Sequence, residues 1–221
     1  MIIMKVVVLY GHHIEERDFT ERVCRGYEKR FCPNEDILKI IPLNSIHARD
    51  EKNEPTIDKD ISDIIIQYQP KVLIDLHHVD GFTEEGSFKG YVPIYQPTHI
   101  DFSKPVWILY DEGIHNVTKE KKLFIEFLKK QKDISELKYC WYKLNKRWDK
   151  RKFPIVLQIE SLLYGKNFNF PDNEINRNSF EKTIGFLHKI EEYAKAHEFE
   201  SKFPAVDWLQ SKFYLLEDRF K

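Results

Sequence analysis

The stretch VVVLYGHHIEER, residues 6–17, decides how the rest of the chain is interpreted. It begins with a continuous apolar run rich in β-branched residues, which is typical of a strand buried on both faces of a parallel sheet. Gly11 ends this run, and a charged segment with the pattern of an amphipathic helix follows. A buried strand that leads directly into a helix predicts an α/β fold.

The same stretch holds the densest group of side chains that can bind a metal. His12 precedes Glu15 by three residues, and His13 precedes Glu16 by three. On a helical turn this spacing brings an imidazole nitrogen and a carboxylate oxygen to one side, where they can share a cation. The stretch alone leaves both pairs open as metal ligands.

The rest of the chain alternates apolar strands with amphipathic helices. We expect strands at residues 37–43, 71–77, 106–110 and 154–160, a short strand or packed turn at 139–142 and a further edge strand at 91–95. We expect helices at 15–30, 57–68, 117–132, 179–197 and 208–220, the second of them capped by Thr56. The order predicts a single α/β domain over residues 1–221 with parallel strands.

Charge and cysteine content exclude several classes of protein. The 35 basic and 36 acidic residues give a net charge of -1, so no overall field attracts nucleic acid or an anionic membrane. The basic stretch 143–152 is therefore interpreted as a solvated loop. Three cysteines without a CxxC pair indicate neither a disulfide framework nor a thiolate zinc site, which fits the reducing cytoplasm. No run approaches the roughly 20 apolar residues that span a bilayer.

Metal-binding and acidic residues follow three of the predicted strands. His13 with Glu16 follows the first, His77 or His78 ends the third, and Glu160 ends the fifth. Ligands of open α/β sheets bind beyond the carboxyl ends of the strands. Two histidines and one carboxylate are the ligands of a catalytic zinc ion that keeps a fourth position for water, and a further carboxylate can then move the proton of that water. Asp75 shares a face with His77 and can orient its imidazole.

These motifs resemble a known family. GHHIEE, residues 11–16, looks like the ligand motif of the zinc carboxypeptidase superfamily, particularly its succinylglutamate desuccinylase and aspartoacylase branch, although Ile14 stands where that family has glycine. IDLH, residues 74–77, looks like the segment that supplies the third ligand, and Glu160 stands where the family places its general base.

The resemblance implies a three-layer α/β domain with a mixed, largely parallel sheet flanked by helices. It implies one zinc ion per chain, held by His13, Glu16 and His77, and activation of water by Glu160. Arg49 and Asn44 follow the second predicted strand, where they could hold a substrate carboxylate.

We therefore expect a cytoplasmic zinc hydrolase of the carboxypeptidase or acyl-amino-acid deacylase type. Its partner is a small acyl-amino acid or peptide, with no nucleic acid and no membrane. Two alternatives stay open: a deformylase similar to N-formylglutamate amidohydrolase, and a non-catalytic ligand-binding protein on the same fold. Glu160 favours an enzyme, because a binding protein has no need of a base there.

Overall fold

The computed structural model describes residues 5–43, 54–83, 85, 87, 100–111, 119–139, 154–165 and 173–197. Asn44 and Arg49, expected to bind substrate, lie outside these residues. So do the strand expected at 91–95, most of the segment 139–142 and the helix expected at 208–220.

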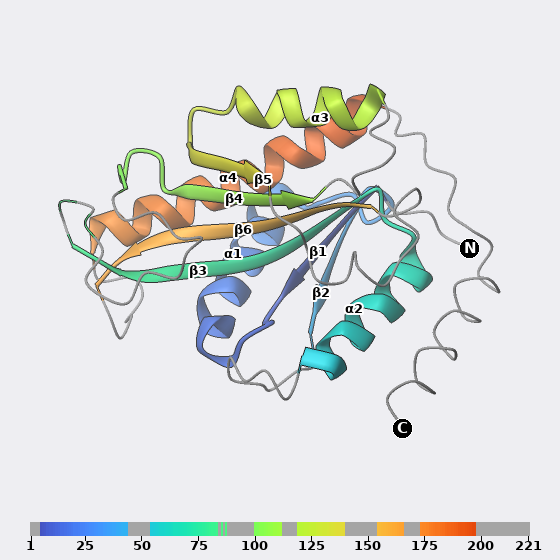
Figure 1. Cartoon of the computed structure of the whole chain (residues 1–221), viewed down its shortest axis with the longest axis horizontal. Helices are drawn as coiled ribbons and strands as arrows, with labels where there is room; N and C mark the ends of the chain where they lie inside the picture. Colours follow the sequence, from blue (N-terminus) through green and yellow to red (C-terminus); the bar gives the residue numbers. More distant parts are fainter. Residues whose placement is uncertain are drawn as a thin grey trace.

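The fold is built on one mixed six-stranded sheet with the order β2-β1-β3-β6-β4-β5 (Figure 1). The strands are β1 (Val6–Tyr10), β2 (Leu38–Pro42), β3 (Val72–Phe82), β4 (Val106–Asp111), β5 (Ile134–Tyr139) and β6 (Ile155–Tyr164). Every pair of neighbours is parallel except β4 with β6. The expected mixed, largely parallel sheet is confirmed.

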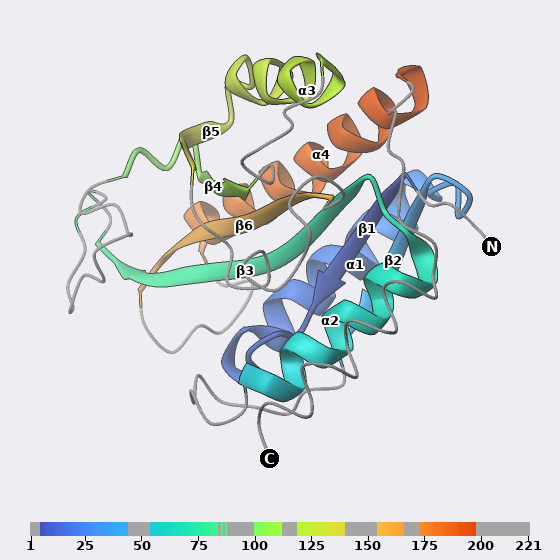
Figure 2. The same cartoon turned by 45° about the vertical axis from the view of Figure 1, so that its right-hand side comes forward.

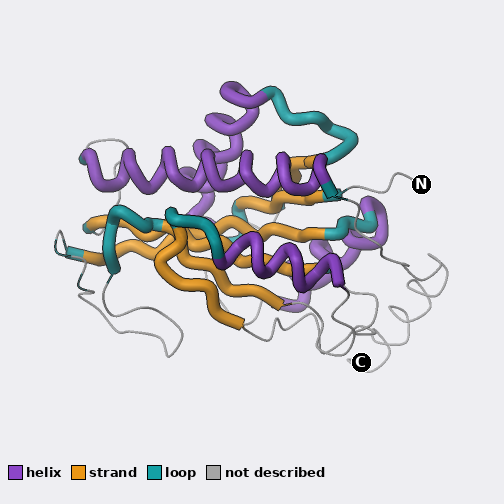
Figure 3. Tube along the Cα trace, turned by 90° about the horizontal axis from the view of Figure 1, so that it is seen from above, coloured by secondary structure: helices purple, strands orange, loops and turns teal. Residues whose placement is uncertain are grey.

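Helices cover both faces of this sheet, because the strands are apolar on both sides. Val6 and Val8 belong to one core cluster with residues of α1 (Arg17–Phe31), α3 (Lys119–Lys129) and α4 (Glu174–Ala196), which cover this face. The alternate residues Val7 and Leu9 pack with α2 (Glu54–Tyr68) on the other face. The two layers of helices are visible in Figures 2 and 3.

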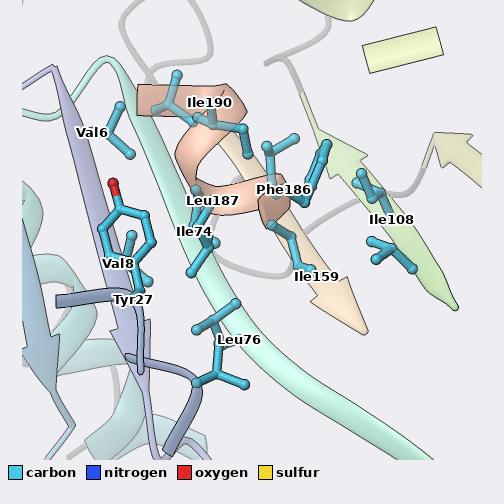
Figure 4. Packing of buried hydrophobic residues seen from close by; sticks show 14 of the residues in the cluster. Val6, Val8, Tyr27, Ile74, Leu76, Ile108, Ile159, Phe186, Leu187 and Ile190 are labelled. Atoms are coloured by element: carbon cyan, nitrogen blue, oxygen red, sulfur yellow. The ribbon is translucent and has the colours of Figure 1, made fainter. Parts of the chain in front are cut away.

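The larger core lies between the sheet and the helices α1 and α4. Figure 4 shows Ile74 and Leu76 of β3 packed beneath Leu187 and Ile190 of α4. The two helices cross closely at Gly26: a Cβ atom there would lie only 2.7 Å from Cδ1 of Ile184. Glycine at this point therefore sets how near α1 approaches α4.

Several boundaries differ from those expected. β3 continues to Phe82 and β6 to Tyr164, beyond the expected ends at His77 and Glu160. The helix α2 begins at Glu54, so the prediction that Thr56 caps it is wrong; Pro55, as its second residue, suits a first turn in which backbone N–H groups have no helical partner. Among the described residues, no helix is long and apolar enough to cross a membrane.

β5 and α4 begin earlier than expected. The strand that runs to Tyr139 starts at Ile134, although the pattern had indicated only residues 139–142. The helix α4 starts at Glu174, where Asn173 caps it by accepting a hydrogen bond from the backbone N–H of Asn176 at 2.7 Å.

Candidate metal centre

A tight turn after β1 brings the first two candidate ligands together. Gly11 takes the left-handed conformation with φ of +80°, and the backbone N–H of Glu16 donates to the carbonyl of His13 at 3.2 Å. The turn places Nδ1 of His13 3.2 Å from Oε1 of Glu16. Ile14, which stands in place of the family's glycine, is 46% exposed. Its side chain therefore points away from the site, and the turn forms without a glycine there.

His77 lies in the middle of β3, so the expectation that it ends its strand is wrong. β1 is the shorter neighbour: Leu9 is in register with Asp75, and β1 ends one residue later at Tyr10. The turn after β1 consequently lies beside the middle of β3. This difference in strand length is what brings Glu16 to His77, with 2.7 Å between Oε2 of the glutamate and Nδ1 of the histidine.

Glu160 is also placed by the sheet, again in the middle of its strand. It is in parallel register with His77, and Gln158 is in register with Asp75. Neighbouring strands lie about 5 Å apart, and residues in register point to the same face, so Glu160 lies beside His77 on the face covered by α2. Nε2 of Gln158 donates to Oε1 of Glu160 at 2.8 Å.

The other ring nitrogen of His77 faces a second carboxylate. Nε2 of His77 lies 3.1 Å from Oδ2 of Asp75, and Nδ1 of His12 lies 2.7 Å from the same oxygen. The site is thus a row of alternating rings and carboxylates in the order His13, Glu16, His77, Asp75, His12. The row closes on itself, because the ring centroids of His12 and His13 lie 4.6 Å apart. The expectation that Asp75 could orient His77 agrees with this geometry.

The centre of this row is buried, which constrains its charge. Asp75 is 0% exposed, Glu16 2% and His77 3%. Burial favours the neutral carboxyl forms, but the charge and hydrogen bonds of the histidines outweigh it, so the pKa values of Glu16 and Asp75 are both lowered. Burial likewise opposes a charge on His77, but Asp75 and Glu16 raise its pKa above the usual range. Two buried carboxylates that stay ionised need positive charge nearby.

Two groups of residues in this row can supply three ligands to one ion. They are His13, Glu16 and His77, and His12, Asp75 and His77; within each, the ligand atoms lie within 4.8 Å of one another. The groups share His77 through its opposite nitrogens. Two imidazoles and a carboxylate are a ligand set typical of catalytic zinc, and a bound divalent cation can replace the proton of His77 as the positive charge beside the buried carboxylates. The residues therefore fit zinc.

The neighbouring candidates lie elsewhere. The side chain of His78 projects to the opposite face of the sheet, where its ring packs edge-on against Phe19 with 5.5 Å between centroids. Glu15 is exposed. Of the two histidines in β3, only His77 belongs to the row, and of the two glutamates after β1, only Glu16 does.

Two residues of this region were not found from the sequence. Gln158 stands two positions before Glu160 in an otherwise apolar strand, and this period of two could have indicated a shared face. Trp107 of β4 is in register with Glu160 from the antiparallel side. No local pattern signals that pairing, because it depends on which strands become neighbours.

No family model matches the chain, and no curated protein matches its sequence. Similar solved structures include the catalytic domain of CwlV, an N-acetylmuramoyl-L-alanine amidase from Bacillus (Paenibacillus) polymyxa var. colistinus (TM-score 0.47, 13% identity, 85% of this chain and 99% of that chain). The CwlD amidase from Clostridioides difficile is another (0.43, 12%, 87% and 98%). A third is Pyrococcus furiosus PbaA, an archaeal homolog of a proteasome-assembly chaperone (0.47, 14%, 99% and 91%). At these values the similarities assign no function.

Proposed function

We propose that the protein is a zinc-dependent hydrolase that cleaves an amide or peptide bond, of the carboxypeptidase or acyl-amino-acid deacylase type. One observation carries the proposal. His77 in β3 contacts Glu16, which follows the neighbouring strand β1, and it is the in-register neighbour of Glu160 in β6 on its other side. A three-ligand set and a separate carboxylate are thereby brought side by side. This is the arrangement that metal-assisted hydrolysis needs.

Of the two possible ligand sets, we assign His13, Glu16 and His77 to one zinc ion per chain. Glu16 faces Nδ1 of both histidines, so three ligand atoms converge on the turn after β1. Asp75 then lies 3.1 Å from Nε2 of His77 through its Oδ2, where the carboxylate can orient the imidazole. His12 donates to the same oxygen of Asp75 and holds that carboxylate in place.

In the proposed reaction Glu160 moves the proton. Zinc, when bound, polarises a carbonyl and lowers the pKa of water. Glu160 takes a proton from the attacking water as the new C–O bond forms, and delivers it to the leaving nitrogen as the C–N bond breaks. Gln158 holds one oxygen of Glu160 through its amide. Arg49 and Asn44 remain our candidates for binding a carboxylate of a small acyl-amino acid or peptide.

Metal analysis of two alanine variants tests the ligand assignment. His77→Ala should lose stoichiometric zinc. His78→Ala, which changes the next residue but on the opposite face, should keep it, provided that circular dichroism shows both variants folded. Native protein without stoichiometric zinc would refute the proposal.

Hydrolysis of a fluorogenic panel of acyl-amino acids, formyl-amino acids and C-terminal dipeptides tests the role of Glu160. Glu160→Gln should keep zinc and lose activity by about 10²–10⁴-fold, the usual contribution of a general base. Unchanged activity in that variant would remove Glu160 from the reaction. Cleavage of formyl substrates alone would favour a deformylase, and silence of the zinc-loaded protein across the panel would favour a binding protein.

A further inference from the structure

Trp107 projects toward the same region as Glu160. The two residues are in register across the antiparallel pair β4 and β6. Side chains of such pairs point to the same face, with Cβ atoms about 4.5–5.5 Å apart. Trp107 is therefore the neighbour of Glu160 on the side away from His77.

The indole of Trp107 carries a buried N–H group without an acceptor. The residue is 1% exposed, and its Nε1 atom has no hydrogen-bond partner in the part of the chain that the structure describes. The hydrophobic side chains that pack around it offer no acceptor: Val79, Phe82, Ile100, Leu109 and Leu162, with Phe102 packed against them. Glu160, its neighbour in the sheet, accepts from Gln158 on Oε1, and neither of its carboxylate oxygens accepts from the indole N–H.

Buried polar groups in folded proteins nearly always have partners, and an exception calls for an explanation such as a bound ligand. An indole N–H can only donate. The missing partner is therefore a hydrogen-bond acceptor, and a group that presents only N–H donors does not meet the requirement.

We infer that Trp107 is a substrate-binding residue whose indole N–H donates to a carbonyl or carboxylate oxygen of a ligand held beside Glu160. The inference rests on the proposed hydrolase function and adds the substrate feature that is recognised. An amide substrate carries such an oxygen on its acyl group, next to the bond that Glu160 serves. The apolar cluster around Trp107 keeps water from competing for the same N–H.

Indole N–H signals in a ¹H–¹⁵N NMR spectrum test this directly. The chain has four tryptophans, so the spectrum has at most four such signals, and the one absent from Trp107→Phe is assigned to Trp107. Zinc-loaded protein is titrated with acetohydroxamate, which carries a carbonyl oxygen and binds zinc. We expect the Trp107 signal to move downfield more than the other three, with the same dissociation constant as the bulk binding curve.

Affinity measurements separate the hydrogen bond from packing. Trp107→Phe should weaken acetohydroxamate binding about fivefold to tenfold, as expected for loss of one hydrogen bond to a neutral acceptor, without changing the zinc content. Phe82→Leu alters the same apolar cluster without removing a donor and should change affinity less than twofold. Should Trp107→Phe fold poorly, benzothienylalanine at position 107 replaces the N–H by sulfur at nearly constant shape and should give the same loss.

The outcomes distinguish this inference from the function on which it rests. Zinc and acetohydroxamate binding with an unmoved Trp107 signal would overturn the role of Trp107 alone. An equal loss of affinity in Phe82→Leu and Trp107→Phe would do the same, because packing would then explain both. Protein that binds no zinc would overturn the proposed hydrolase and this inference together.

Discussion

Replacing Glu16 by glutamine is the sharpest test of where the metal binds. Glu16 lies between Nδ1 of His13 and Nδ1 of His77, so the substitution removes one of three proposed ligands while keeping the side-chain shape. Four-ligand zinc sites in small peptides bind with about 10–16 kcal/mol, or roughly 2.5–4 kcal/mol per ligand. At about 1.4 kcal/mol per tenfold, Glu16→Gln should raise the dissociation constant of zinc about 10²–10³-fold.

Two further variants make this prediction decisive. Glu15→Gln removes an exposed carboxylate one residue away and should leave zinc affinity within about twofold of native, since an exposed charge near a buried site is screened by solvent. Asp75→Asn removes a carboxylate that in our assignment only supports His77, so its effect should be smaller than that of Glu16→Gln, about 10–100-fold.

The assay is competition for zinc with a chromogenic chelator at neutral pH. A larger loss in Asp75→Asn than in Glu16→Gln would refute the assignment and place the ion on the His12 and Asp75 side of His77. A loss of zinc affinity in Glu15→Gln, with native affinity in Glu16→Gln, would refute the proposal that Glu16 is the ligand supplied by the turn after β1.

Three other predictions concern stability. Gly26→Ala should lower the free energy of unfolding by about 1 kcal/mol or more, because overpacking against Ile184 outweighs the gain in helix propensity. Gly185→Ala, whose Cβ atom would meet nothing within 4 Å, should raise it by about 0.5–1 kcal/mol, and urea unfolding measures both variants. A change of the same sign in both variants would contradict the close crossing of α1 and α4. Burial alone would raise the pKa of Glu191, but hydrogen bonds that include one from the Tyr27 hydroxyl lower it. The ionised carboxylate therefore stabilises the fold above about pH 4.5, and this stabilisation is lost as pH falls through the lower pKa of the folded state. The difference in unfolding free energy between native protein and Glu191→Gln should shrink on acidification, and a constant difference would show that Glu191 is not ionised in the fold. Excess EDTA should lower the melting temperature of zinc-loaded protein, as measured by calorimetry. The loss corresponds to about 2.7 kcal/mol of unfolding free energy if the free zinc concentration had been 100 times its dissociation constant. An unchanged melting temperature would argue against a bound ion.

The local patterns of the sequence were enough to find most elements of the fold. The apolar run at Val6–Tyr10 and the four-residue spacing that follows it correspond to β1 and α1. Both elements are recognised from the spacing of their apolar residues, which a short window of sequence contains. The ends of β3 and β6 were not found this way, because a polar residue does not end a strand when its side chain has polar neighbours on the sheet.

The residues of the candidate site were named from the sequence, but their arrangement could not be predicted. His77 and Glu160 were expected to meet because each was thought to end a strand, whereas they meet because β3 and β6 are direct neighbours in the middle of the sheet. Trp107 joins them only because β4 inserts antiparallel to β6. Strand order depends on the packing of the whole chain, so no window of sequence contains it. The roles of Asn44 and Arg49 stay predictions.

The relative position of His77 and Glu160 does not depend on the segment that connects their two strands. Their spacing is held by backbone hydrogen bonds between β3 and β6, not by the 72 residues that lie between the two strands in the sequence. Insertions or deletions in that connection could alter what reaches the candidate site while leaving His77 and Glu160 at the same separation. A slip of one residue between β3 and β6 would instead send either His77 or Glu160 to the opposite face of the sheet. Changes in the connecting segment can therefore alter what binds, whereas the register of β3 and β6 has to be kept.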